Sequence, residues 1–166
     1  MEVKQADGGG PKVGRPHVQG YELDQAKVES LLPWAWVSER MLVGHNYWVG
    51  TTRPDGRPHA MPVWGVWLDE VFYFSTGRQS RKGRNLATRP EVVVHLESGD
   101  EVVVFEGTVE DFNDSAFFAR FAEIYQAKYN FKPEPDPQNA YYRLNPRVVF
   151  AWKENDFVNS ATRWEF

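Results

Sequence analysis

Residues 46–75 read NYWVGTTRPDGRPHAMPVWGVWLDEVFYFS, in which runs of aromatic and β-branched residues alternate with turn residues. Side chains of these types favour strands. Between the first two runs, Pro54 presets one backbone angle and Gly56 supplies a positive φ, so the chain is expected to reverse there. The stretch therefore predicts three consecutive antiparallel strands, at 46–52, 59–68 and 70–75.

Pro62 lies inside the second of these strands. Because proline has no N–H to donate to a neighbouring strand, a strand that contains it is expected at the edge of a sheet or at a bulge. A binding site beside such a strand can use backbone groups that no neighbouring strand occupies.

The rest of the chain adds further strands and a few helices. Hydrophobic periodicity predicts helices at 21–32, 33–43, 80–88 and 114–130, the last capped by Asp114 or Ser115. Further strands are expected at 91–96, 101–111, 147–153 and 161–165, with a proline-rich loop at 132–139. Consecutive short antiparallel strands with few helices indicate a barrel, in a mainly β fold with helices of the α+β class.

Bulk composition bounds the number of domains and the class of partner. A chain of 166 residues suits one domain, at 21–166, and the Gly- and Pro-containing residues 1–20 are expected to form a flexible tail. The net charge of −4 argues against nucleic acid as a partner. No apolar stretch or signal-peptide pattern predicts a membrane segment, so a cytoplasmic location is expected. Cysteine is absent and the four histidines lack metal-ligand spacing, so no metal site is expected.

A local cluster of positive charge interrupts this acidic chain. Five cations and no acid lie between Arg78 and Arg89. Arg81 and Lys82 fall in the first turn of the expected helix, where the helix dipole disfavours cations by roughly 0.3–1 kcal/mol each. A bound phosphate would offset this cost by accepting hydrogen bonds from backbone N–H groups, the Ser80 hydroxyl and both charged side chains. Charge alone leaves a solvated basic helix face as an equal alternative.

Three segments of the chain resemble a known family. They are GRPHAMPVW at 56–64, FYFST at 72–76 and SRKGRNL at 80–86, the last followed by Arg89-Pro90. Over about residues 46–112, their order and spacing are similar to the pyridoxamine 5′-phosphate oxidase-like family of flavin and deazaflavin oxidoreductases. The resemblance implies a split β-barrel of the FMN-binding type that forms a homodimer, with a cofactor in each of two clefts between the subunits.

The resemblance also implies roles for individual residues. Arg81 and Lys82 are expected to hold the cofactor phosphate, the backbone of 61–63 to lie along the flavin ring, and 74–76 to flank it. Trp152 and Arg163 look like residues that such proteins reach across from the partner subunit. The full set of expected cofactor contacts is His59, Ala60, Met61, Pro62, Val63, Phe74, Ser75, Thr76, Ser80, Arg81, Lys82, Trp152 and Arg163.

The chain departs from the true oxidases at positions that hold pyridoxal phosphate. Full similarity would require an arginine in place of Met61, a lysine near Val66, and an Arg-Leu-His-Asp-Arg run in place of NSATR at 159–163. Because these cations and this histidine are missing, oxidation of vitamin B6 is rejected. The resemblance then points to the broader set of the family, whose members use FMN or the deazaflavin coenzyme F-420.

The expected activity is two-electron hydride transfer between FMN, or alternatively F-420, and an unidentified small molecule. Hydride transfer is the cofactor's own chemistry, so no catalytic triad is expected, and backbone donors near Val63 are expected to bond the ring. His59 is a candidate proton donor to the substrate, with a structural role as the alternative. Trp64 and Trp152 are candidates for the ring cleft. A non-catalytic flavin-binding module and a haem-binding barrel stay open as alternatives.

Overall fold

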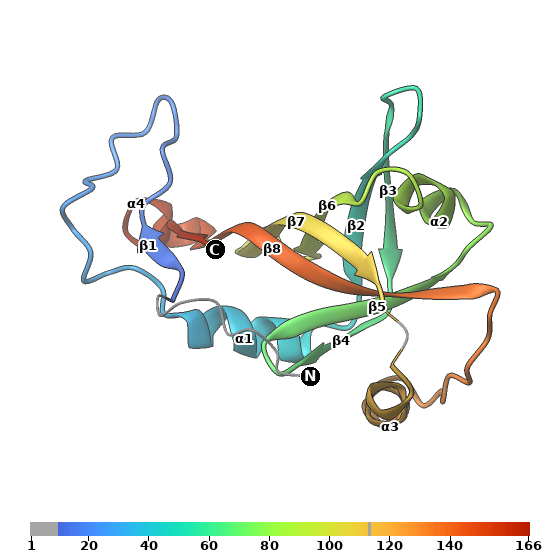
Figure 1. Cartoon of the computed structure of the whole chain (residues 1–166). Helices are drawn as coiled ribbons and strands as arrows, with labels where there is room; N and C mark the ends of the chain where they lie inside the picture. Colours follow the sequence, from blue (N-terminus) through green and yellow to red (C-terminus); the bar gives the residue numbers. More distant parts are fainter. Residues whose placement is uncertain (1–9, 113) are drawn as a thin grey trace.

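The computed structural model describes residues 10–112 and 114–166, which form a curled antiparallel sheet with helices packed against it (Figure 1). The strands are β1 (Lys12–Gly14), β2 (Tyr47–Thr52), β3 (Pro58–Val63), β4 (Gly65–Leu68), β5 (Val71–Gly77), β6 (Glu91–Leu96), β7 (Glu101–Asp111), β8 (Asn139–Lys153) and β9 (Thr162–Glu165). The helices are α1 (Trp34–Val43), α2 (Arg81–Leu86), α3 (Ser115–Tyr129) and α4 (Phe157–Ser160), with a 3-10 turn at Glu154–Asp156. The strand order is β1-β9-β8-β7-β6-β2-β3, and β5 pairs with both β4 and β8. The mainly β fold with helices, expected from the sequence, is confirmed.

The first predicted hairpin forms as expected. β2 and β3 pair antiparallel along their whole length. In the turn between them, Gly56 has a φ of +85°, and its N–H donates to the carbonyl of Arg53 over 2.9 Å. β3 ends the strand order, so the expectation that the strand containing Pro62 lies at an edge is confirmed.

The second predicted strand is not continuous. It is divided at Trp64 into β3, which pairs with β2, and β4, which pairs with β5. A Cβ at Gly65 would lie 2.4 Å from a ring carbon of Phe72, so the chain can turn this corner only with a residue that has no side chain. The expected continuous strand at 59–68 was therefore wrong, and a corner between two hairpins replaces it.

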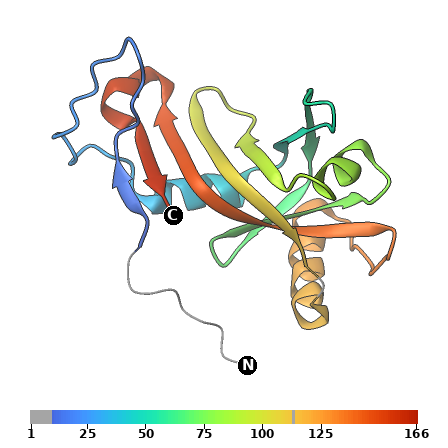
Figure 2. The same cartoon turned by 45° about the horizontal axis from the view of Figure 1, so that its top comes forward.

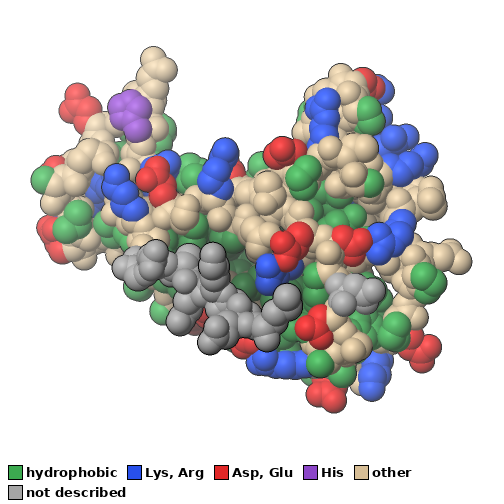
Figure 3. Space-filling model, viewed as in Figure 1, with side chains coloured by type: hydrophobic (Ala, Val, Ile, Leu, Met, Phe, Trp, Pro, Cys, Tyr) green, Lys and Arg blue, Asp and Glu red, His purple; other side chains and the backbone are tan. Residues whose placement is uncertain are grey.

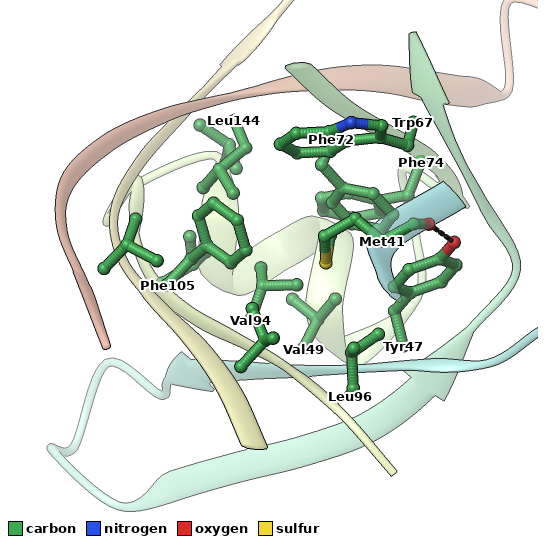
Figure 4. Close-up of a cluster of buried hydrophobic side chains, with 14 of the residues drawn as sticks. Met41, Tyr47, Val49, Trp67, Phe72, Phe74, Val94, Leu96, Phe105 and Leu144 are labelled. Carbon is green, nitrogen blue, oxygen red and sulfur yellow. Dashed lines mark hydrogen bonds between the residues drawn. The ribbon is translucent and has the colours of Figure 1, made fainter. Parts of the chain in front are cut away.

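The main core fills the space between the sheet and α1 (Figure 4). Tyr47 and Val49 from β2 and Phe72 and Phe74 from β5 are fully buried, and α1 adds the fully buried Met41. The Tyr47 hydroxyl donates to the Met41 carbonyl over 2.5 Å, which ties the helix to the strand. Burial of each large apolar side chain contributes roughly 1.5–3 kcal/mol, so this cluster is a main source of stability.

α3 covers a second hydrophobic cluster. Its N-cap Asp114 accepts hydrogen bonds from two backbone N–H groups of the first turn, at 2.9 and 3.0 Å. Phe121 and Tyr125 belong to a buried cluster that includes Val66 of β4. The amphipathic helix predicted at 114–130 is thereby confirmed, with its cap. None of the helices described in this chain is long and apolar enough to cross a bilayer.

The segment before α1 differs from its prediction. Arg15 is 6% exposed, and its guanidinium donates to the carbonyls of Asp24 and Lys27 at 3.1 and 2.8 Å. An α-helix would direct these carbonyls along its own axis, but here turns point them at Arg15, and the Asp24 carbonyl also accepts the N–H of Lys27. The helix predicted at 21–32 was therefore wrong, and turns replace it.

The tail predicted over 1–20 falls partly on described residues. There, Lys12–Gly14 forms β1 by pairing with β9, which adds backbone hydrogen bonds to an edge of the sheet. This strand lies before the domain boundary predicted at residue 21, which stays a prediction. The remainder of the predicted tail, residues 1–9, lies outside the described residues.

β8 is longer than the strand predicted at 147–153. Its first half pairs with β5 on one side, and β7 pairs with it along nearly its whole length. The register with β7 shifts next to Gly107, where a Cβ would lie 2.2 Å from the carbonyl oxygen of Asn145. Pro146 lies next to this bulge. Because a proline inside a run argues against a strand, the sequence pattern did not predict the first half of β8.

Candidate functional site

α2 lies at one end of the molecule, next to β2 and β3 (Figures 1 and 2). Ser80 caps this helix, because its hydroxyl accepts the N–H of Gly83 over 3.0 Å and lies 3.0 Å from the Thr76 hydroxyl. A Cβ at Gly83 would lie 2.4 Å from the carbonyl oxygen of Gly77, so glycine allows the close approach of α2 to the end of β5. The helix predicted at 80–88 is confirmed, and its start is held against β5.

Lys82 is a buried cation on this helix. Its residue is 7% exposed, and no ion pair or hydrogen bond to it is found within residues 10–112 and 114–166. Burial lowers the pKa of the Lys82 ammonium to about 8, with no carboxylate to oppose the shift. A buried charge of this kind is costly unless an opposite charge joins it.

His59 is joined to α2 through β2. Its Nδ1 lies 3.4 Å from Oγ1 of Thr51, and Thr51 accepts a hydrogen bond from Nδ2 of Asn85 over 3.0 Å. Asn85 is fully buried, and its Oδ1 has no partner in the described part of the chain. These contacts connect the edge strand β3 with the helix that carries Lys82.

Three positive charges act on His59. Burial first, and then the charges of Arg53, Lys82 and Arg81, lower the pKa of the His59 ring, so it is neutral at pH 7. Among the residues described, none of these three cations has an acidic partner, and the buried Nε of Arg53 has no hydrogen bond. We call Arg53, Arg81 and Lys82 the cation cluster. Figure 3 shows Lys and Arg side chains gathered on the side of the molecule where α2 lies.

The other cations near α2 have different surroundings. Arg78 pairs with Asp111 over 2.5 Å, and Arg89 donates to a backbone carbonyl of the β2–β3 turn over 3.3 Å. Arg84 is exposed. Arg81 is exposed as well, so the alternative of a solvated basic face describes both Arg81 and Arg84, whereas Lys82 is buried. An anion with two or more negative charges suits the cation cluster, because several charged donors can bond to it at once.

β3 offers an open edge and open surface beside the cation cluster. Ala60, Met61 and Pro62 are exposed, and Val63 is half-buried. β3 pairs only with β2 among the described strands, so backbone groups on its other edge have no strand partner there. His59 and Ala60 also line a hollow of about 650 Å³ with residues of β6, β7 and β8. This volume lies within the usual range of small-molecule sites.

The remaining predicted contacts are spread over the molecule. Phe74 is fully buried in the core, so its side chain can only support the site from behind. Ser75 and Thr76 are half-buried at the end of β5 that leads to α2. Trp152 and Arg163 lie on β8 and β9, toward the opposite end of the molecule from α2 (Figure 2), and each contacts a glutamate. A single chain therefore does not bring them to the cation cluster.

Sequence reasoning missed Thr51, Arg53 and Asn85. Asn85 follows Lys82 by three residues, and this spacing puts both side chains on one helix face, so helical periodicity could have found it. Thr51 and Arg53 reach the site from β2 and its turn. Nothing in the local sequence separates them from the end of an ordinary strand.

Comparisons with known proteins give a family match and a set of similar folds. A family model described as "Pyridoxamine 5'-phosphate oxidase" matches residues 45–153, and no curated protein matches the chain. Among solved structures, the conserved hypothetical protein Rv2991 from Mycobacterium tuberculosis is 23% identical, with a TM-score of 0.65, over 74% of this chain and 85% of that chain.

Two further solved structures of similar fold have names that mention a cofactor. An F420 reductase is 24% identical, with a TM-score of 0.52, over 67% of this chain and 94% of that chain. A haem-binding protein from Mycobacterium smegmatis is 18% identical, with a TM-score of 0.58, over 72% of this chain and 54% of that chain. At these identities, the likeness shows a shared fold alone.

Proposed function

Since the chain belongs to the pyridoxamine 5′-phosphate oxidase family, whose model matches residues 45–153, we propose that it is an oxidoreductase that binds FMN at the cation cluster. The deazaflavin coenzyme F-420 is the alternative cofactor, because it also carries a phosphate. In this proposal, a hydride passes between the cofactor and a small molecule.

The observation that carries the proposal is Lys82, which is buried and has no acidic partner among the residues that the structure describes. A lysine ammonium in water needs no counter-charge. Lys82 is only 7% exposed, so a nearby anion would stabilise its charged form. Arg81 and Arg53 add two more positive charges, which act together with Lys82 on the ring of His59. A phosphate dianion would be held by Lys82 and Arg81, with the Ser80 hydroxyl as a further donor.

The neighbouring strand supplies what the ring of such a cofactor needs. Met61, Pro62 and Val63 would hold the ring, with backbone groups at the open edge of β3 toward its polar atoms. When bound, a flavin or deazaflavin supplies the hydride chemistry itself. His59 is neutral, and the contact of its Nδ1 with Thr51 leaves Nε2 as the atom that can hold or release a proton.

The proposal includes a homodimer. Trp152 and Arg163 lie toward the opposite end of the folded molecule from α2. In this proposal, their copies on a second subunit therefore reach the cation cluster. Each site would then be completed by Trp152 of the partner subunit and Arg163 of the partner subunit.

Vitamin B6 oxidation is not part of the proposal. Met61 and Val66 stand where an arginine and a lysine would be needed, and neither side chain carries a charge. Val66 is 1% exposed and belongs to the cluster under α3, so this position serves packing.

The absorption spectrum of the purified protein tests the cofactor class. We expect a flavin or deazaflavin spectrum, either as isolated or after addition of FMN or F-420, which bleaches on reduction and returns with an electron acceptor. Binding without return of the oxidised spectrum for any acceptor would indicate a non-catalytic flavin-binding module. A Soret band after addition of haem, with no binding of FMN or F-420, would overturn the proposal in favour of haem binding.

A further inference from the structure

Trp64 presents an aromatic face at the corner where β3 passes into β4. Its residue is 42% exposed. One face of the indole is stacked on the ring of Tyr129, with 4.7 Å between the ring centroids and 9° between the planes. Because the stacked face is covered, the exposed area of Trp64 includes the opposite face, which is a flat surface open to a ligand.

Tyr129 is held rigidly beneath this indole. Its hydroxyl lies 2.8 Å from the carbonyl oxygens of His45 and Gly65, to one of which it donates, and it accepts the N–H of Gly65 over 2.9 Å. The close packing of Gly65 against Phe72 fixes the corner itself. A surface held in place before binding loses little conformational entropy when a ligand arrives.

The charge beneath the stack is positive. Nζ of Lys128 donates to the Tyr47 hydroxyl over 2.6 Å and to the Gly65 carbonyl over 3.2 Å, and lies 5.3 Å from the centre of the Tyr129 ring. No carboxylate in the described ranges pairs with this ammonium. A neutral or anionic ligand is therefore favoured over a cationic one.

Two further exposed apolar side chains come from the segments that flank this corner. Met61, which is 51% exposed, precedes it on β3. On the other side Tyr125 lies 6.3 Å from the Trp64 ring and 6.4 Å from the ring of Phe131, which is 57% exposed. We call the stacked rings of Trp64 and Tyr129 the aromatic platform.

We propose that the aromatic platform is the substrate site, and that it binds a planar, conjugated ring compound that is neutral or anionic. Stacking on the open face of Trp64 selects for planarity, and the half-buried Lys128 ammonium beneath Tyr129 selects against positive charge. The role as substrate site rests on the proposed function, because Met61 and Val63, which would hold the cofactor ring, lead directly into Trp64. Binding of the ring compound itself can be measured without any cofactor.

Titration calorimetry with three probes tests this inference. Naphthalene-2-carboxylate is planar and anionic, decahydronaphthalene-2-carboxylate has the same skeleton and charge without planarity, and 2-naphthylmethylammonium is planar and cationic. We expect the first probe to bind at least several-fold more tightly than the other two. Equal binding of the planar and saturated carboxylates would show a general apolar patch and overturn the inference.

Two variants locate the binding. Trp64→Leu keeps apolar bulk but removes the stacking plane, and it should weaken naphthalene-2-carboxylate about three- to tenfold, as expected for an aromatic pair. Tyr21→Leu removes another exposed aromatic ring, which packs on Phe157 of α4 at the other end of the molecule from β3 (Figure 1), and should leave binding unchanged. Unchanged binding in Trp64→Leu, or a change of oligomeric state in its place, would overturn the inference.

These measurements distinguish failure of the aromatic platform from failure of the proposed cofactor site. If the wild-type protein binds the planar probe but neither FMN nor F-420, the proposed function fails and the ring-binding platform stands. If it binds FMN but shows no preference for the planar probe, the platform fails and the cofactor proposal stands.

Discussion

The hydroxyl of Thr51 and Nδ1 of His59 face each other across the β2–β3 pair, 3.4 Å apart. Thr51 is buried and also accepts a hydrogen bond from the buried amide of Asn85 on α2. The position of His59 relative to Lys82 is therefore set by packed side chains on a strand and a helix. Such a site is better preorganised than one built on loops.

The hydrogen bond between Asn85 and Thr51 should contribute measurably to the free energy of unfolding. Thr51→Val leaves Nδ2 of Asn85 buried without its acceptor, which should lower the free energy of unfolding by about 1–3 kcal/mol in urea denaturation. Thr52→Val, on the other face of β2, is the matched control and should change it by less than about 0.5 kcal/mol. Equal losses in both variants would contradict this assignment.

The corner at Gly65 should tolerate no side chain. In Gly65→Ala the new methyl group would lie 2.4 Å from the Phe72 ring and 2.8 Å from the carbonyl oxygen of Tyr73, so we expect a loss of about 2 kcal/mol or more. Gly50→Ala is a matched control within β2, where the nearest atom is 3.5 Å away. Thermal unfolding of the two variants compares them, and a Gly65→Ala protein as stable as Gly50→Ala would refute the packing argument.

Burial of Lys82 should destabilise the cofactor-free protein below about pH 8. The pKa of Lys82 is about 8 in the folded chain and 10.5 in the unfolded one. Between these values the unfolded chain binds more protons, so this group makes the wild-type protein more stable as pH rises. Lys82→Met should therefore be more stable than wild type at pH 7, by about 1–3 kcal/mol, and lose this advantage toward pH 10. A difference in urea unfolding that does not change with pH would contradict the burial of a charge.

The affinity for FMN should depend on whether the Lys82 ammonium is protonated. Above about pH 8 the Lys82 ammonium loses its charge, so wild-type affinity should fall several-fold between pH 7 and 9.5. His59, whose pKa is lowered, stays neutral over this range and contributes no change. Fluorescence titrations of wild type and Lys82→Met at both pH values measure this. A pH dependence of the same size in the variant would assign the effect to another group.

Local signals in the sequence predicted much of the fold. The turn at Pro54 and Gly56 and the cap at Asp114 act within a few residues, and the structure confirms both elements that they define. Gly65 acts through packing against Phe72 across the β4–β5 pair, and Arg15 acts through the carbonyls of Asp24 and Lys27 and those of the 158–161 segment. No local pattern reveals such contacts.

Some features of the candidate site could likewise be predicted from local sequence, and others depend on tertiary packing. Arg81 and Lys82 stand out in the sequence because they are cations at the start of a short helix in an acidic chain. Which cation is buried depends on how α2 packs against β2, and so does the presence of Thr51 and Asn85 beside it. The sequence therefore predicted the charge of the site but not the side chains that position it.

The central claim is that Lys82 and the cation cluster bind the phosphate of a flavin cofactor. Riboflavin has the ring of FMN but no phosphate, so the ratio of the two dissociation constants isolates the phosphate contribution. We predict that wild type and the exposed control Arg84→Met bind FMN at least about tenfold more tightly than riboflavin, and that Lys82→Met reduces this preference several-fold, since a charged hydrogen bond is worth about 1.5–3 kcal/mol. Equal affinity of the wild-type protein for FMN and riboflavin, or an undiminished preference in Lys82→Met, would contradict the claim.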